Sequence, residues 1–239
     1  MSVLEKIVED KKALLAKSKK NVPMNEMISQ SRAAKDPASL VKAVKIRGVL
    51  SIIAEMKKKS PSAGTLIEKY DPAEIARTYE RCGARCLSVL TEEKHFDGST
   101  EHLLDAKRAT RLPILRKDFV LDPYQVYESR AIGASCVLLI AAILDRVLLA
   151  ELLDLSREIK MDALVEVHDE PELESALKAG SDLLGINNLD LKDLSVNVET
   201  TFRLRKYIPE GVCVVSESGI NSPEIIGRLR RACPQKRRS

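Results

Sequence analysis

The chemistry of this 239-residue chain is suggested by charged residues that stand within or directly after apolar segments. Glu55 and Lys57 follow the apolar part of "VLSIIAEMKKKS", Lys117 ends "LPILRK", and Glu166 lies inside "DALVEVH". A lone charge in a buried strand is costly unless it is paired, so we expect these lysines and glutamates to neutralise one another in one cluster. Such clusters shift pKa values, which suits a general acid and a general base.

Two polar residues directly follow the first of these segments. Lys59 and Ser60 come after Lys57, and alternation places Glu55, Lys57 and Lys59 on one side if the strand stays extended. These residues are therefore candidates for binding a substrate. A run of lysines at the end of a strand is equally typical of solvated surface.

An anion-binding turn is indicated near the carboxyl end of the chain. Asn187 closes the segment "LLGINN", and Ser218 and Gly219 lie in "SESG", directly before a capped helix. Amide groups at such a turn bind phosphate, although Ser-Gly is also a common turn dipeptide. Together with the charged cluster, this turn indicates cofactor-free acid–base chemistry on an anionic, phosphorylated small molecule.

Seven short apolar segments must position these residues. Because the segments are continuously apolar rather than alternating, they are typical of parallel strands covered on both faces. They begin at Gly48, Arg85, Leu112, Cys136, Asp162, Leu183 and Val212.

The stretches between the apolar segments carry helix signals. Asp71-Pro72 and Asp122-Pro123 each place an N-cap before a proline at the first helical position, with Glu74 and Gln125 completing capping-box patterns. Each helix is expected to end at a glycine shortly before the next strand. Variant starts contain Pro171 and Pro223, and the terminating glycines are Gly83, Gly133 and Gly180.

This alternation predicts an α/β fold of parallel βαβ units. At this length a (βα)8 TIM barrel is the first expectation and an open doubly wound sheet the second, and no G-x-G-x-x-G follows the first strand. Residues 1–46 are expected to form an N-terminal helical extension that caps the barrel. Residues 47–232 would form the barrel through its seventh strand and helix. Residues 233–239 would form an aberrant basic tail, with the last βα unit missing.

Composition excludes several classes of function. Aromatic residues are only 3% of the chain, which argues against stacking on single-stranded nucleic acid. Much of the net charge of +4 comes from the tail, so no nucleic-acid partner is expected. Five cysteines without a CxxC pair are typical of a reduced cytoplasmic protein. Three histidines without ligand spacing predict no metal site, and no apolar run is long enough for a membrane span.

Six sequence motifs resemble those of the indole-3-glycerol-phosphate synthases and occur in the same order. The motifs read "IIAEMKKKSPSAG", "TEEKHFDGS", "LRKDFVLDPYQVYESRAIGA", "LVEVHDEPELESAL", "GINNLDL" and "SESGINSP", and the resemblance as a whole runs from about Leu4 to Leu229. The resemblance implies a (βα)8 barrel and a carbon–carbon lyase of tryptophan biosynthesis. It also implies conversion of 1-(2-carboxyphenylamino)-1-deoxyribulose 5-phosphate to indole-3-glycerol phosphate, with loss of CO2 and water and without a cofactor.

The resemblance also implies residue roles. Lys117 is expected to protonate the ketone oxygen during ring closure, and Glu166 is expected to be its acid–base partner in dehydration. Lys57 is expected near the anionic groups of the substrate. Other expected site residues are Glu55 and Asn187, which would organise the charges, the pocket residues Lys59, Ser60, Phe96, Phe119 and Leu138, and Ser218 and Gly219, which would form half of the phosphate site.

Two features depart from the family pattern. Leu189 stands where the family usually has an arginine that helps to hold the substrate carboxylate. The tail "ACPQKRRS" replaces the expected eighth strand, because Pro234 cannot join a β ladder and no β-forming run follows it.

The alternative interpretation is a catalytically dead truncated barrel that acts as a binding or assembly partner, or a frame-shift artefact. Another phosphate-binding barrel, such as a phosphoribosylanthranilate isomerase, would not explain the Lys57, Lys117 and Glu166 set. A monomer is expected, with association through the open barrel edge as the alternative.

Overall fold

The computed structural model describes residues 3–46, 48–61, 63–190 and 195–232. The basic tail predicted at 233–239 lies outside the described residues. None of the described helices is both long enough and apolar enough to cross a membrane.

Seven parallel strands form one sheet, and each coincides with one of the seven predicted apolar segments. They are hydrogen-bonded in chain order: β1 (Ile53–Met56), β4 (Cys86–Leu90), β5 (Ile114–Lys117), β6 (Cys136–Ile140), β7 (Asp162–Val167), β8 (Leu183–Asn187) and β9 (Cys213–Glu217). A separate antiparallel pair, β2 (Lys59–Ser60) and β3 (Gly64–Thr65), follows β1.

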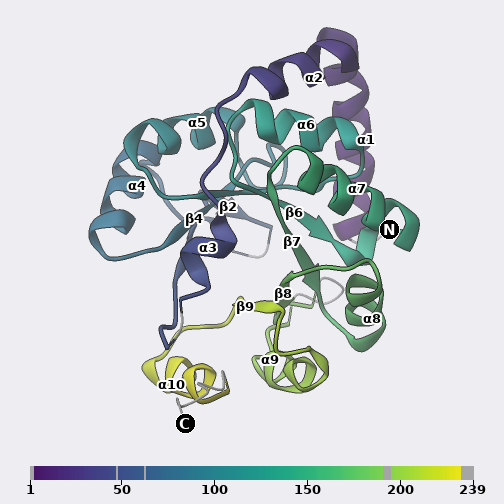
Figure 1. The fold of residues 1–239 in the computed structure, drawn as a ribbon. Coiled ribbons are helices and arrows are strands. Elements are labelled where there is room, and N and C mark those ends of the chain that lie inside the picture. The colour runs from purple at the N-terminus through teal and green to yellow at the C-terminus, as the bar shows by residue number, and fades with distance from the viewer. Residues whose placement is uncertain (1–2, 47, 62, 191–194, 233–239) are drawn as a thin grey trace.

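Helices connect the strands and surround the curled sheet. Figure 1 shows them as a ring around the strands, from α4 at one end of the sheet to α10 at the other. The helices are α4 (Pro72–Arg81), α5 (Thr100–Ala109), α6 (Pro123–Ala131), α7 (Arg146–Glu158), α8 (Glu170–Lys178), α9 (Glu199–Leu204) and α10 (Pro223–Ala232), with short 3-10 turns η1 (Ala141–Ile143) and η2 (Arg205–Tyr207).

The predicted helix signals are confirmed at the residues that carry them. The Asp71 carboxylate accepts the Glu74 N–H at 2.9 Å, and the Asp122 carboxylate accepts the Tyr124 N–H at 2.9 Å. Because the chain must turn left-handed after each helix, glycine stands where φ is positive. The φ angles are +87° at Gly83, +82° at Gly133 and +82° at Gly180.

Alternate strand residues divide the apolar core into two parts. On β6, Val137 and Leu139 pack against the surrounding helices, whereas Cys136, Leu138 and Ile140 belong to an inner cluster. A doubly wound sheet would carry helices on both faces; here one face meets helices and the other meets its own curled strands. The arrangement is therefore a curled, barrel-like parallel sheet. The inner cluster comprises Ile7, Leu40, Cys86, Leu115, Phe119, Cys136, Leu138, Ile140, Leu164 and Leu183.

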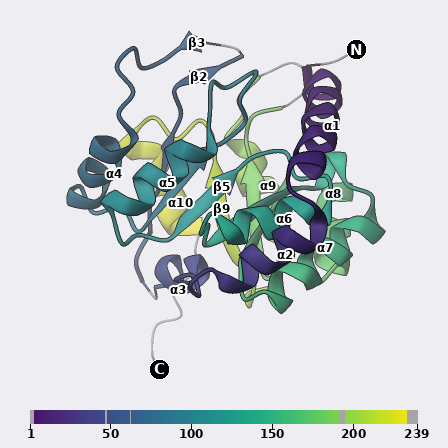
Figure 2. The ribbon, with the colours of Figure 1, turned by 90° about the horizontal axis from the view of Figure 1, so that it is seen from above.

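Three helices precede β1: α1 (Val3–Asn21), α2 (Met24–Ala33) and α3 (Leu40–Val44). In Figure 2 the start of α1 and the β2–β3 pair lie toward one end of the molecule, and α3 lies at the opposite end. Leu40 of α3 is fully buried in the inner cluster. The Asp162 carboxylate, at the start of β7, accepts the Ser39 hydroxyl at 2.9 Å and the Val41 N–H at 3.0 Å. These contacts attach α3 to the amino ends of the strands.

A buried ion-pair network attaches α1 to the carboxyl end of β5. Lys11 Nζ lies 2.6 Å from Asp118 Oδ1, and the two side chains are 5% and 1% exposed. Asp118 Oδ2 also accepts the Thr91 hydroxyl at 2.8 Å and lies 3.1 Å from the Arg116 guanidinium. Arg116 further contacts Glu128 at 2.8 Å. Asp118 directly follows Lys117, so the network also fixes the backbone that carries this lysine.

Candidate functional site

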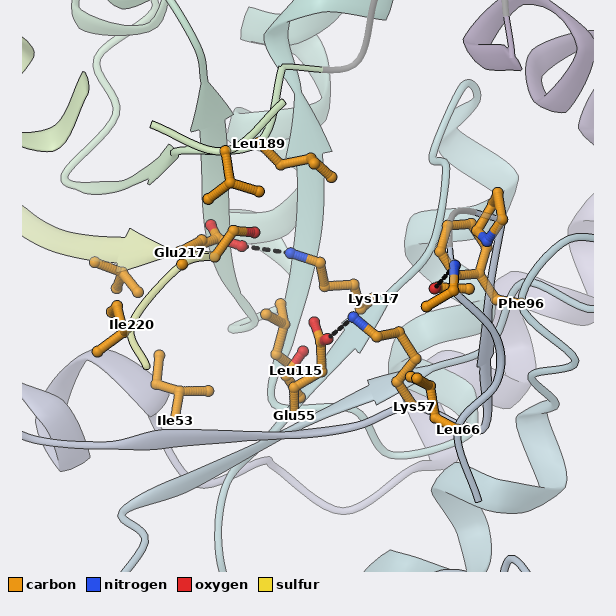
Figure 3. Close-up of a pocket in the computed structure, with 18 of the residues that line it drawn as sticks. Ile53, Glu55, Lys57, Leu66, Phe96, Leu115, Lys117, Leu189, Glu217 and Ile220 are labelled. Carbon is orange, nitrogen blue, oxygen red and sulfur yellow. Dashed lines mark hydrogen bonds and ion pairs between the residues drawn. The ribbon is translucent and has the colours of Figure 1, made fainter. Parts of the chain in front are cut away.

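A cavity of about 610 Å³ lies at the carboxyl ends of the strands, where α/β barrels place their active sites. Its wall combines residues from β1, β5 and β9 with residues of α1 and of the loop around Phe96 (Figure 3). Lys117 and Glu217 point toward each other across this cavity, as Figure 3 shows.

Lys117 lies between two glutamates. Its Nζ is 3.2 Å from Glu166 Oε2 and is in direct contact with Glu217 Oε2. The lysine side chain is 17% exposed, and the two glutamates are 3% and 11% exposed. The structure therefore brings together the predicted Lys117–Glu166 pair and adds a second carboxylate, which sequence reasoning had left outside the site.

A glycine makes room for Glu217. In the register of β8 and β9, Asn187 lies beside Glu217, and Gly185 lies two residues before Asn187 on the same face of β8. A Cβ on Gly185 would collide with Glu217 Oε1. Glycine at this position lets the Glu217 side chain cross over β8 toward Lys117. The sequence does not reveal this contact, because Gly185 and Glu217 lie on different strands that become neighbours only in the folded chain.

The two carboxyl groups differ in acidity. Burial would raise the pKa of Glu166, but Lys117, His168 and Asn187 outweigh burial and lower it to about 2. For Glu217, burial and the neighbouring Glu166 outweigh Lys117 and raise the pKa to about 7. Burial disfavours the charged amine of Lys117, yet the glutamates raise its pKa above the ordinary value. The cluster thus holds a charged lysine, a charged Glu166 and a Glu217 that takes up a proton near neutral pH.

The raised pKa of Glu217 predicts a pH dependence of stability. Between its ordinary value of 4.5 and about 7, the folded chain holds a proton that the unfolded chain has released, so stability falls as pH rises. In the Glu217→Gln variant, the free energy of unfolding should fall by on the order of 2 kcal/mol less than in wild type as the pH rises from about 5 to 6.5. Urea unfolding between pH 5 and 6.5 tests it, because His168, with an ordinary value of 6.5, contributes at higher pH. Glu158→Gln, on the exposed face of α7, is the control. Equal slopes in wild type and Glu217→Gln would contradict the prediction.

Glu55 and Lys57 form a second, more open ion pair. Glu55 Oε1 and Lys57 Nζ are 2.6 Å apart, and their side chains are 35% and 32% exposed. Both residues line the cavity, as expected. Lys59 does not line it, because β1 ends at Met56 and the extended alternation stops before Lys59, which lies in β2.

The turn after β9 forms the polar wall of the cavity, and Asn187, which lines a second cavity instead, contacts this turn. Asn187 Oδ1 accepts the Ser218 hydroxyl at 2.8 Å and the Leu189 N–H at 3.1 Å. Ser218 and Gly219 line the cavity with φ angles of +64° and +72°. A Cβ on Gly219 would lie 2.6 Å from Val196 Cγ1, so glycine is required both for conformation and for space. This turn faces the cavity, and phosphate binding by it stays a prediction.

Aromatic and aliphatic residues form the apolar wall. Phe96 and Phe119 pack with their ring centroids 6.3 Å apart, and both line the cavity together with Leu115. Ser60 also lines it, and its hydroxyl accepts the Ala63 N–H at 3.1 Å. The expectation for Leu138 is wrong: this residue is 1% exposed, packs in the inner cluster and is not part of the lining. Its side chain belongs to the inner cluster, several members of which, such as Leu115 and Leu164, do line the cavity.

His168 also belongs to this region, although the sequence analysis considered histidines only as metal ligands. It directly follows β7, and its Nε2 lies 3.4 Å from Glu166 Oε1. A signal was present in the sequence, because His168 stands two residues after Glu166 and four before Glu172, where β7 passes into α8. Across the described residues, no group of three or more His, Cys, Asp or Glu side chains is arranged to hold a metal ion.

The arrangement can therefore donate and accept protons beside an apolar surface. One cation contacts two carboxyl groups of unequal acidity, a second lysine lies at the cavity mouth, and a glycine-containing turn faces the same space. These features fit an anionic substrate with an apolar ring.

The chain is similar to known proteins over almost its whole length. Residues 4–234 match the family model described as Indole-3-glycerol phosphate synthase. A protein of that name from Desulfotalea psychrophila is 45% identical over 231 residues, which are 96% of this chain and 88% of that protein. Another from Caldanaerobacter subterraneus is 46% identical over 222 residues, which are 93% of this chain and 85% of that protein.

Solved structures support the fold alone. The N-acetylmannosamine-6-phosphate 2-epimerase of Clostridium perfringens superposes with a TM-score of 0.60 at 17% identity, covering 80% of this chain and 85% of that one. The 3-hexulose-6-phosphate synthase of Salmonella typhimurium gives 0.61 at 10% identity, covering 78% and 86%.

Proposed function

This chain belongs to the indole-3-glycerol phosphate synthase family, and from that premise we propose the role of each side chain around its cavity. The reaction is that of a lyase in tryptophan biosynthesis. The substrate 1-(2-carboxyphenylamino)-1-deoxyribulose 5-phosphate undergoes ring closure, decarboxylation and dehydration, giving indole-3-glycerol phosphate. The alternative of a dead barrel is not favoured, because the cluster around Lys117 is assembled in the folded chain.

Lys117 supplies the proton for ring closure. The aromatic carbon that bears the carboxylate attacks the ketone carbon of the sugar, and the ketone oxygen takes a proton as the new C–C bond forms. Lys117 is charged, faces the cavity and contacts both glutamates. Glu217 holds a proton near neutral pH and touches Lys117, so it can return a proton to the lysine afterwards.

The apolar wall of the cavity favours the loss of CO2. After ring closure, the electron pair of the C–C bond to the carboxylate returns to the ring, restores aromaticity and releases CO2. Phe96, Phe119 and Leu115 surround an aromatic ring with apolar side chains and exclude water. Exclusion of water destabilises the carboxylate relative to neutral CO2 and therefore favours the release.

Glu166 acts in the dehydration. The hydroxyl group leaves as water with a proton from the charged cluster, and the neighbouring carbon loses a proton to complete the indole ring. Glu166 is ionised and nearly fully buried, so it is the group best suited to accept this carbon-bound proton. Lys57 and the Ser218–Gly219 turn bind the anionic groups of the substrate, and Glu55 holds Lys57 in place.

The contact of Lys117 with both glutamates is the observation that carries this assignment. The test is turnover by the purified chain, followed by the fluorescence of the indole product. Formation of indole-3-glycerol phosphate supports the assignment. A folded chain that binds the substrate but forms no product would refute it.

Leu189 is expected to limit substrate affinity. It lines the cavity next to the Ser218–Gly219 turn, where its apolar side chain offers no partner to a carboxylate. Leu189→Arg should lower KM about tenfold, since a charge-assisted hydrogen bond contributes roughly 1.5–3 kcal/mol. Steady-state kinetics test this, with Leu189→Met as a control of similar size. An unchanged or raised KM for the arginine variant would argue against a carboxylate position here.

As the alternative to the expected monomer, we propose association through the edges of the sheet. Among the described residues, β1 and β9 each pair with one neighbour only, and a closed barrel would place a further strand between them. All five residues of β9 are partly exposed, whereas β4, β6 and β8 are fully buried. Large apolar side chains are exposed beside both edges: Val49, Leu50, Ile52, Ile220 and Ile226. Unpaired edges with such neighbours favour self-association.

Sedimentation velocity over a range of concentrations tests this association. Ile52→Lys, directly before β1, should shift the chain toward monomer by placing a charge at the edge. Val147→Lys is the matched control, because Val147 is 70% exposed at the start of α7, away from both edges. A wild-type chain that stays monomeric at high concentration would contradict the proposal.

The cytoplasm is the compartment that fits the cysteines. Cys82, Cys86 and Cys136 are free thiols, and burial raises the pKa of Cys86 and Cys136. Buried neutral thiols pack as small apolar side chains and require no oxidising environment.

A further inference from the structure

His168 occupies a position between two carboxylates. Its backbone N–H donates to Glu172 Oε2 at 2.8 Å, and its ring Nδ1 lies 3.0 Å from the same oxygen. On the other side of the ring, Nε2 lies 3.4 Å from Glu166 Oε1. The side chain is only 14% exposed, so solvent screens these contacts weakly.

The two contacts favour one protonation state of the ring. A neutral imidazole carries one N–H and one acceptor nitrogen, whereas both nitrogens of His168 face carboxylate oxygens. Nδ1 is within hydrogen-bond distance of Glu172, and Nε2 makes no hydrogen bond but lies within ion-pair distance of Glu166, an arrangement that favours a proton on each nitrogen. Burial lowers the pKa of His168, but the neighbouring carboxylates of Glu166 and Glu172 outweigh it and raise the pKa to about 10.

The other charged groups around His168 do not oppose a positive charge on its ring. A second cavity beside it is lined by Asp169 and Glu172 of the α8 start, Asp190 of the loop after β8, and Arg203 of α9. Asp169 caps α8 by accepting the Glu172 N–H at 3.0 Å, and Arg203 pairs with Glu170. The surrounding charge is thus mostly negative, which favours a cationic ring.

This geometry fixes both oxygens of Glu166. Oε1 faces His168 and Oε2 faces Lys117 at 3.2 Å. Glu217 contacts the same lysine but has no histidine. The His168 contact is therefore a structural difference between the two glutamates that share Lys117.

We propose that His168 is a permanently charged positioning residue, anchored by Glu172, that holds Glu166 as the ionised base and keeps its Oε2 directed at Lys117. The catalytic consequence rests on the function proposed above, whereas the charge of the ring does not. His168 itself does not touch the reacting atoms. Its effect is to decide which of the two glutamates carries the negative charge.

The charge state is tested first, without turnover. In ¹⁵N-histidine-labelled chain, NMR should show two protonated ring nitrogens for His168 from pH 6 to pH 8.5, and Glu172→Gln should lower its titration point by at least about one pH unit. His168→Gln assigns the signal. An unprotonated ring nitrogen at pH 8 would overturn the proposal, whether or not the chain turns over. Absence of turnover with a doubly protonated ring would instead refute the proposed function.

Kinetics then test the positioning role. His168→Ala should reduce kcat at least about tenfold with KM changed less than about threefold, because a general base that is misplaced or protonated affects chemistry more than binding. The acid limb of the kcat profile should move up by about one to three pH units, since Glu166 loses a neighbouring cation. His168→Lys should restore part of this shift and His168→Gln should not.

The matched control is Glu174→Gln on the exposed face of α8, paired with Lys178, which should leave kcat and the profile unchanged. An unmoved acid limb in His168→Ala would overturn the positioning role even if kcat fell, because a purely structural loss does not change the pKa of Glu166.

Discussion

Lys117→Ala is expected to reduce kcat by about 10²–10⁴-fold, the usual contribution of a positioned general acid. Lys117 faces the cavity and contacts Glu166 and Glu217, so its removal takes away the proton donor and the cation that orients both carboxylates. Single-turnover kinetics with saturating substrate measure the chemical step directly. Binding through Lys57 and the Ser218–Gly219 turn should persist, so KM should change less than kcat.

The fold should survive this substitution near neutral pH. Without the lysine, Glu166 and Glu217 would be two buried carboxyl groups with less compensating charge, but Glu217 already takes up a proton near pH 7. Circular dichroism and thermal unfolding check that the variant is folded. Lys178→Ala, on the exposed face of α8, is the matched control and should retain full activity. A folded Lys117→Ala variant with more than about a tenth of wild-type kcat would refute the assignment of the acid.

Asp118→Asn is expected to destabilise the chain by about 3–5 kcal/mol, the usual effect of removing one partner from a buried ion pair. Lys11 and Arg116 would both lose a carboxylate partner, and they are 5% and 4% exposed. Arg116 keeps Glu128 at 2.8 Å, whereas no other ion pair is recorded for Lys11 among the described residues. The free energy of unfolding in urea measures the loss.

Lys11→Met separates the anchoring of α1 from the rest of the network. It should cost less than Asp118→Asn, because Asp118 keeps Arg116 and the Thr91 hydroxyl. In the double variant the Lys11 charge is gone, so its cost should be clearly less than the sum of the single costs. Additive costs would show that Lys11 and Asp118 are energetically independent. In wild type, burial opposes ionisation of Asp118, but Lys11 and Arg116 lower its pKa, so this stabilisation is present above its ordinary value of 3.8 and is lost as pH falls below it.

Local features were largely predictable. The seven apolar segments became the seven parallel strands, and Asp71 and Asp122 cap the helices that follow them. Gly83, Gly133 and Gly180 end helices with positive φ. These outcomes depend on propensities and hydrogen bonds within a few residues, which is why a single sequence contains them.

Site positions were predictable where topology alone decides. Lys117 and Glu166 stand at the carboxyl ends of parallel strands, and such ends converge on one side of a barrel. The alternation of side chains along an extended strand did not predict the position of Lys59 correctly, because β1 ends at Met56. It placed Leu138 on the inner face of the sheet, where the inner cluster covers it and keeps it out of the cavity lining.

The sequence by itself determined the strands, the capped helices, the family and the residues at the strand ends. Only the tertiary structure decided which of those residues touch. Lys11 reaches Asp118, Gly185 makes room for Glu217, and His168 lies between Glu166 and Glu172. Each of these arrangements depends on the packing of separate elements. In the resulting buried cluster Glu166 is charged, whereas Glu217 takes up a proton near neutral pH. The type of a residue is a local property, whereas its acidity is set by neighbours that folding brings to it.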